Sequence, residues 1–143
     1  MKLSARFMME FMRGHYGPTQ SIAFVPGDLA IRIGARTSNL LIDRQNALKL
    51  RHKHRFRYEH FELIQPSINE GWVIIERGDL VFIYVAEAPF FSTFALVVKQ
   101  ARGGEEIWLK TFHRIQPTKV RRLLRDNEML REHSTGSSLI EDE

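Results

Sequence analysis

A ten-residue stretch at 51–60, RHKHRFRYEH, is dense in cationic and titratable side chains. Guanidinium and ammonium groups neutralise phosphates, and an imidazole exchanges protons near neutral pH. Three readings of the stretch are open: the solvated end of a helix, a metal site, or a surface that contacts nucleic acid. Its candidate nucleic-acid contacts are Arg51, His52, Lys53 and Arg55, and its candidate proton carrier is His54.

The spacing of the histidines argues against the metal site. His52 and His54 are two residues apart, and helix positions two apart point to different faces. The chain has no cysteine and no HExxH-type spacing. We therefore expect no metal ligand and no cofactor. No glycine-rich phosphate loop is present, which argues against an ATPase, a kinase or a dehydrogenase.

A second candidate site lies at the end of a predicted strand, in the run Thr111-Phe112-His113-Arg114. A hydroxyl, an imidazole and a guanidinium within four residues suit phosphoryl chemistry. Thr111 would position a phosphate or a ribose hydroxyl, His113 would move a proton, and Arg114 would stabilise negative charge. Arg77, which ends an earlier predicted strand, is either a turn residue or another phosphate contact.

The Gly103-Gly104 pair predicts a two-residue hairpin turn, because glycine tolerates the positive φ that such turns need. This register places Lys99 opposite Trp108. The outer face of the predicted hairpin then carries Lys99, Trp108, Lys110, Phe112 and Arg114. Cations interleaved with aromatic rings on an open sheet face can hold phosphates and stack bases. The alternative is a solvated face whose aromatic rings are half covered by a helix or loop.

The apolar pattern predicts the elements that position these residues. Predicted helices cover 2–13, 39–54, 58–64 and 118–131. Predicted strands cover 21–25, 29–33, 72–77, 79–86, 93–100 and 106–112. A turn at 26–28 makes the first two strands a hairpin, and Thr37, Ser38 or Asn39 would cap the second helix. The third helix would stop at Gln65, because a following proline disfavours helical geometry.

The length of 143 residues indicates one domain. We expect an α+β fold over 1–132, with N-terminal helices packed on a four-stranded antiparallel sheet and a C-terminal helix. Residues 1–36 would form an extension with a helix and a hairpin, and residues 133–143 a frayed acidic tail. The net charge of +4 favours anionic partners. No apolar run is long enough to span a bilayer, and we expect a cytoplasmic protein without a membrane partner.

The order and spacing of five segments carry a family resemblance: LLIDRQNALKLRHKH, YEHFELIQPSINEG, WVIIERGDLVFIY, FALVVKQ and WLKTFHR. Their arrangement resembles the barnase–EndoU–colicin–RelE superfamily of small nucleases, particularly the nuclease-like domains of phages and other mobile elements. The matching positions are His54 at a helix end, Glu59–Phe61 at a helix start, Lys99 and Thr111–Arg114 at strand ends, and Arg77 after the first strand.

The resemblance implies a toxin-like endoribonuclease that cleaves RNA without a metal ion. The ribose 2′-hydroxyl would attack the adjacent phosphorus, while one group removes its proton and another protonates the leaving 5′-oxygen. If the protein is a toxin, it would have a dedicated inhibitor, an acidic antitoxin or immunity protein. The alternative is a non-catalytic nucleic-acid-binding or phage accessory protein on the same scaffold. A third reading is an interaction domain whose basic stretch only solubilises a helix end.

Overall fold

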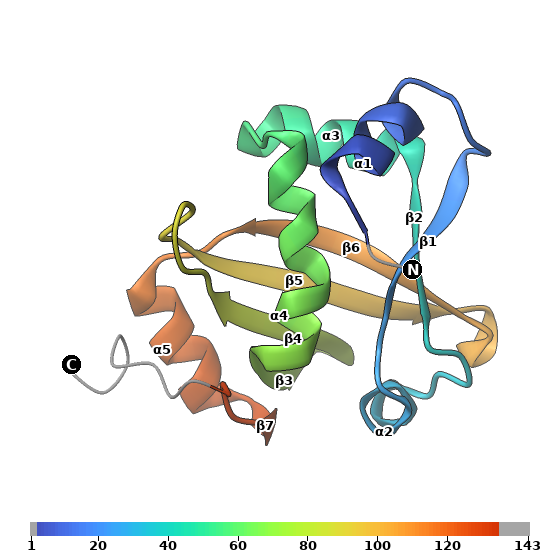
Figure 1. Ribbon diagram of the computed structural model, residues 1–143. Helices are drawn as coiled ribbons and strands as arrows, with labels where there is room; N and C mark the ends of the chain where they lie inside the picture. The colour runs from blue at the N-terminus through green and yellow to red at the C-terminus, as the bar shows by residue number, and fades with distance from the viewer. Residues whose placement is uncertain (1–2, 135–143) are drawn as a thin grey trace.

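The computed structural model describes residues 3–134 and contains one mixed sheet of seven strands, in the order β1-β2-β6-β5-β4-β3-β7 (Figure 1). The strands are β1 (Thr19–Phe24), β2 (Asn39–Asp43), β3 (Trp72–Glu76), β4 (Asp79–Val85), β5 (Thr93–Ala101), β6 (Glu106–Arg114) and β7 (Glu128–Arg131). The α-helices are α1 (Ala5–Met12), α2 (Gly27–Ala30), α3 (Arg44–His54), α4 (Ile64–Glu70) and α5 (Pro117–Asp126). Three 3₁₀ helices are η1 (Ile31–Ile33), η2 (Tyr58–Leu63) and η3 (Arg102–Gly104).

The α+β class is confirmed, but the prediction of a four-stranded antiparallel sheet is wrong. The four central strands β3 to β6 do form an antiparallel meander. Three further strands extend it: β7 pairs with β3, and the β1–β2 hairpin joins through a parallel pairing of β2 with β6. The meander was predictable because its strands are rich in β-branched and aromatic residues. The added strands are short and carry less of that pattern.

The N-terminal hairpin has a different second strand from the one predicted. Residues 29–33 form α2 and η1 instead of a strand, and β1 pairs with β2. In β2 the side chains of Leu40 and Ile42 alternate into the core, as expected for a strand with one buried face. The helix predicted from residue 39 therefore begins at Arg44. Its cap is Asp43, whose Oδ1 accepts a hydrogen bond from the Asn46 N–H at 2.7 Å.

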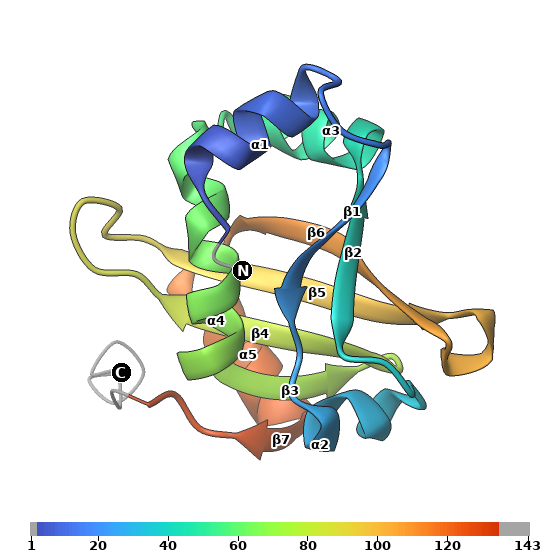
Figure 2. The ribbon, with the colours of Figure 1, turned by 45° about the vertical axis from the view of Figure 1, so that its right-hand side comes forward.

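Helix α3 lies along the edge of β6 where β2 has turned away. Strand β2 pairs with β6 at only two positions, and Figure 2 shows the β1–β2 hairpin crossing the direction of the central strands. Beyond that point, Asn46 donates to the Leu109 carbonyl (3.0 Å) and Arg114 donates to the His54 carbonyl (2.8 Å). The eight residues from Asn46 to His54 span about 12 Å of helix. The five from Leu109 to Arg114 span about 16 Å of strand, so the two elements run side by side.

The sheet buries side chains on both of its faces. The first core lies under α1, α3, η2 and α4, and its largest fully buried side chains include Met8, Phe11, Phe61, Phe82, Phe94 and Phe112. The second core lies under α5, on the opposite face of the sheet from α4 (Figures 1 and 2). It contains Trp72, Ile74, Val81, Ile83, Ala95, Ile115, Val120 and Leu123. Because α5 is short, it covers only part of that face.

Two predicted ends are also corrected. The third helix does not stop at Gln65, since α4 continues through Pro66 to Glu70. Pro66 lies in the first turn of α4, where its missing N–H breaks no helical hydrogen bond. The final helix ends at Asp126, and β7 follows.

The start of the predicted tail is packed against the fold. His133 is buried and accepts a hydrogen bond from the Val85 N–H at 3.2 Å, and the Ser134 N–H donates to the Glu70 carbonyl at 2.8 Å. The remainder of the predicted tail lies outside the described residues. Within residues 3–134, the longest helices are too short and too polar to cross a membrane.

Candidate functional site

A β-bulge at Lys110 decides which residues of β6 face the core. Leu109 pairs with Val98 and Thr111 pairs with Val97, so Lys110 is an extra residue without a partner on β5. Phe112 therefore points into the first core, where it is fully buried, and His113 takes the opposite face. The predicted register held for Lys99 and Trp108 but failed beyond the bulge, where it had placed Phe112 and Arg114 on the outer face. A bulge of this kind shifts the side-chain alternation by one residue.

Two predicted proton carriers, His54 and His113, lie next to each other. Their ring centroids are 5.8 Å apart, because α3 runs beside β6 and ends level with the end of that strand. The Thr111 hydroxyl lies 3.3 Å from Nδ1 of His113. Three residues from two elements thus form a histidine cluster, which we define as His54, Thr111 and His113.

Both imidazoles of the histidine cluster favour the neutral form. Burial lowers the pKa of His113 to about 4, with further contributions from His54, Lys119 and Lys53. Burial also lowers the pKa of His54, and the charges of Lys53 and Arg114 act in the same direction. At neutral pH each ring therefore has one protonated nitrogen and one nitrogen with a free lone pair.

Arg114 links the end of α3, which carries His54, to the end of β6, which carries His113. Its guanidinium donates to the His54 carbonyl, lies 3.2 Å from Nε2 of His60, and is stacked 5.1 Å from the ring centroid of Phe56. A planar guanidinium with several donors suits such a bridge. Arg114 was predicted to contact phosphate, but in the structure it joins the end of α3 to the end of β6.

His60 lies next to Arg114 and was not among the residues predicted for the site. It is 7% exposed, and its ring stacks on Phe56 with centroids 4.8 Å apart. Its Nδ1 accepts from the Arg57 N–H at 2.9 Å. Burial lowers the pKa of His60, and the nearby Arg114 charge lowers it further. In the sequence, His60 stands out only as the third histidine of the stretch 51–60.

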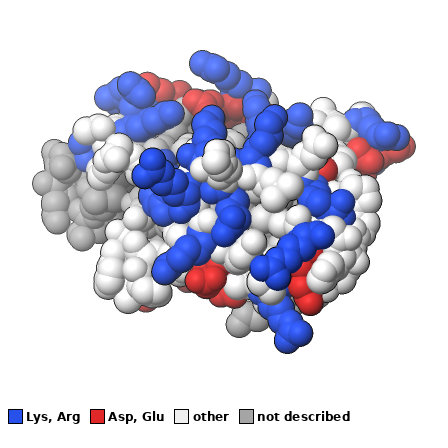
Figure 3. All heavy atoms as spheres, turned by 90° about the horizontal axis from the view of Figure 1, so that it is seen from above, with Lys and Arg blue, Asp and Glu red and all other residues white. Residues whose placement is uncertain are grey.

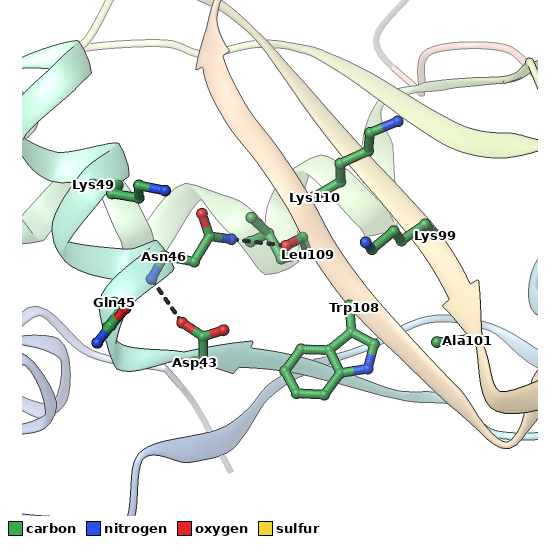
Figure 4. Close-up of a pocket in the computed structure, with 9 residues that line it drawn as sticks. All are labelled: Asp43, Gln45, Asn46, Lys49, Lys99, Ala101, Trp108, Leu109 and Lys110. Atoms are coloured by element: carbon green, nitrogen blue, oxygen red, sulfur yellow. Dashed lines mark hydrogen bonds between the residues drawn. The ribbon is translucent and has the colours of Figure 1, made fainter.

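A pocket of about 480 Å³ lies at the other end of the α3–β6 pairing. Residues lining it are Asp43, Gln45, Asn46, Lys49, Lys99, Ala101, Trp108, Leu109 and Lys110. In Figure 4, Lys49 from α3 and Lys99 from β5 point into it from opposite sides, and Trp108 borders it below. Lys110 is turned away and pairs with Asp79 at 3.1 Å. Two predicted residues, Lys99 and Trp108, thus meet at this pocket together with Lys49, which had not been predicted.

Arg77 and Arg51, two further predicted residues, lie outside the histidine cluster and the pocket. Arg77 occupies the β3–β4 turn, with φ of 52°. Ile83 of β4 lies in the same row of the sheet as Ala95 and His113, and the turn adjoins Asp79, four residues before Ile83. About 13 Å along the strand direction therefore separates the turn from the row that contains His113. Arg51 stacks on Tyr58, with 4.2 Å between its Cζ and the ring centroid. His52, Lys53 and Arg55 are exposed at the end of α3.

Lysine and arginine side chains gather over the face formed by α3 and β6. Figure 3, which views the molecule from above, shows them spread across this side with few carboxylates between them. Trp108 and His113 are five residues apart on the same face of β6, about 16 Å along an extended strand. The pocket and the histidine cluster therefore lie one after the other on a single basic surface.

No protein-family model, curated protein or solved structure matches this chain. The superfamily resemblance therefore stays a prediction. In the part of the chain from 3 to 134, no three His, Asp or Glu side chains lie close enough together to hold a metal ion. What the site can do follows from its own geometry: two neighbouring imidazoles can accept and donate protons, beside cations that attract an anion.

Proposed function

We propose that this protein binds RNA across the face of α3 and β6 and cleaves it at the histidine cluster without a metal ion, as a toxin-like endoribonuclease. The observation that carries the proposal is the 5.8 Å separation of the His54 and His113 rings. Two imidazoles at this distance can act on the two sides of one phosphodiester, where a proton must leave one oxygen and reach another.

The proposed reaction transfers one proton in each direction. Nε2 of His113 accepts the proton of the ribose 2′-hydroxyl, whose oxygen bonds to the adjacent phosphorus. The bond from phosphorus to the 5′-oxygen breaks, and His54 protonates that oxygen. The products are a 2′,3′-cyclic phosphate and a 5′-hydroxyl. Thr111 supports this assignment, because its hydroxyl can accept from Nδ1–H of His113 and leave Nε2 free as the acceptor.

The pKa directions support the same division of roles. His113, with a pKa of about 4, is unprotonated at neutral pH and fits the base. His54 also has a lowered pKa, but a bound phosphate would raise it, because negative charge favours the imidazolium. Lys53 and Lys119, whose charges act on His113, would stabilise the negative charge that develops on phosphorus-bound oxygens.

A non-catalytic nucleic-acid-binding role is the second candidate, and the position of Arg114 favours it. The guanidinium that was expected to contact phosphate is engaged by the His54 carbonyl and the Phe56 ring, and Arg77 lies on another part of the sheet. In either role the partner would be RNA, and an acidic inhibitor protein would complement the basic face. The absence of cysteine fits the reducing environment of the cytoplasm, where we place the protein.

Cleavage of a fluorescent single-stranded RNA, in EDTA and in magnesium, tests the proposal. We expect equal rates in both buffers, and at least about a hundredfold loss in His54→Ala and in His113→Ala. His15→Ala removes an exposed imidazole from the α1–β1 loop and should cleave normally. If the RNA stays intact at a wild-type protein concentration that saturates binding, cleavage is refuted and only the non-catalytic binding role is left. Binding that does not weaken with added salt would contradict both roles.

A further inference from the structure

Asp43, which lines the pocket between α3 and the sheet, caps α3 with only one of its two carboxylate oxygens. Asp43 accepts the Asn46 N–H with Oδ1, and in Figure 4 its other oxygen is turned toward Trp108. Among residues 3–134, no side chain or backbone donor contacts this second oxygen. We propose that the pocket binds one nucleobase of a single-stranded RNA and that Asp43 selects a base with an exocyclic amino group over uracil.

The rest of the pocket supplies the other contacts that a nucleotide needs. Trp108 is half-buried in β6, and its indole N–H donates to Glu106 at 3.0 Å, which fixes the orientation of the ring. A base that stacks on an aromatic side chain gains about 1–3 kcal/mol. Lys49 and Lys99 are exposed and point inward from opposite sides, so their ammonium groups can contact the phosphate of that nucleotide.

The inference rests on the proposed function for the biological ligand, because the pocket lies on the same strand face as the histidine cluster. About 16 Å of extended strand between Trp108 and His113 leaves room for more than one nucleotide. The base in the pocket would therefore belong to a nucleotide beyond the cleaved bond. It would set sequence preference without taking part in proton transfer.

Cytosine and uracil make the matched pair for this inference. They have the same size, but cytosine presents an amino donor where uracil presents a carbonyl oxygen. The free oxygen of Asp43 would accept from the amino group and would repel the carbonyl. A hydrogen bond to a charged group contributes about 1.5–3 kcal/mol, so we expect cytidine 3′-monophosphate to bind at least about tenfold more tightly than uridine 3′-monophosphate.

Asp43→Asn should reverse this preference and leave the fold intact. Asparagine caps helices as well as aspartate does, so its oxygen would take the place of Oδ1 on the Asn46 N–H. The amide NH₂ would then occupy the position of the free carboxylate oxygen. A donor at that position would bind the uracil carbonyl and repel the cytosine amino group.

The two tryptophans allow the test to be read without any cleavage. The indole N–H signal of Trp108 in a ¹H–¹⁵N spectrum should move as either nucleotide is added. The signal of Trp72, which is 7% exposed in the second core, should stay in place. Trp108→Phe assigns the two signals. Lys49→Ala and Lys99→Ala should weaken both nucleotides equally, by about fivefold. Arg125→Ala, which removes a distant exposed cation, should leave both affinities unchanged.

Each outcome decides the inference separately from the proposed cleavage. Tighter binding of the cytidine nucleotide to wild type, together with the reverse order in Asp43→Asn, supports the pocket even if RNA stays intact. Three results would overturn the inference even if RNA is cleaved. They are equal affinities of wild type for the two nucleotides, an Asp43→Asn variant that still prefers the cytidine nucleotide, and a Trp108 signal that does not move. Circular dichroism of Asp43→Asn shows whether α3 is retained.

Discussion

Replacement of His113 by asparagine should remove part of the dependence of stability on pH. His113 has a pKa of about 4 in the folded protein, against about 6.5 in an unfolded chain. Between these values the unfolded chain binds more protons than the folded protein does. The free energy of unfolding therefore falls as the pH drops from about 6.5 to about 4. Asparagine keeps a donor near the Thr111 hydroxyl but cannot take up a proton.

The size of the effect follows from the two pKa values. Linkage gives about 2 kcal/mol as the loss from pH 7 to pH 5 that one such group causes. His113 is only half-buried, and screening by water reduces the expected difference to roughly 1 kcal/mol. Urea unfolding of wild type and His113→Asn at both pH values measures it. Any constant cost of asparagine in a strand cancels, because each protein is compared with itself.

His15→Asn provides the matched control, since it removes an exposed imidazole far from the histidine cluster. Its change in stability between the two pH values should equal that of wild type. If His113→Asn and wild type also lose the same free energy, within about 0.3 kcal/mol, then His113 titrates normally in the folded protein. The cluster would then not hold a neutral imidazole by burial, and the assignment of His113 as base would fail.

Three further predictions concern the turn at η3, the arginine bridge and the proposed activity. Gly104→Ala should cost more than about 3 kcal/mol in urea unfolding, because its Cβ would lie 2.0 Å from the Gly34 carbonyl oxygen at φ of 95°. Gly103→Ala, in open space at φ of 65°, should cost about 1 kcal/mol, and equal costs would contradict the packing of this turn. Arg114→Lys should lower stability by about 1 kcal/mol and increase amide hydrogen exchange at the end of α3; unchanged exchange would show that the bridge to His54 is unimportant. The kcat/KM for RNA cleavage should peak below about pH 6.5, because burial lowers the pKa of both cluster histidines. A maximum above neutral pH would contradict their roles.

The central strands were predictable because their sequence pattern fits a strand and does not fit a helix. Strands β3 to β6 combine β-branched residues with clear turn residues between them. Residues 29–33 show why the N-terminal region was not. Leu29, Ile31 and Ile33 alternate with other residues as in a strand, yet the segment folds as a short helix with Leu29 and Ile33 buried and Ile31 69% exposed. Over five residues, periodicity does not separate a strand from a helical turn.

The candidate site was predictable in its residue types but not in its assembly. His54 and His113 stand out because imidazoles at a helix end and a strand end suit proton transfer. Their contact depends on β2 leaving β6 after two residue pairs, which lets α3 occupy the edge. Asp43 was read as part of a helix, and its role in the pocket appeared only once β2 was seen to end there. Tertiary pairing of this kind leaves no local pattern in the sequence.

The bulge in β6 also determines where this strand can change in length. Lys110 has no partner on β5, so a chain lacking that residue would keep Thr111 opposite Val97. Phe112 would stay in the first core, and the imidazole of His113 would stay on the outer face. Loss of Phe112 would instead bring His113 into its place, with the imidazole toward the first core. Homologous chains with one residue fewer in β6 should therefore have lost it at the bulge, and their histidine would still reach the end of α3.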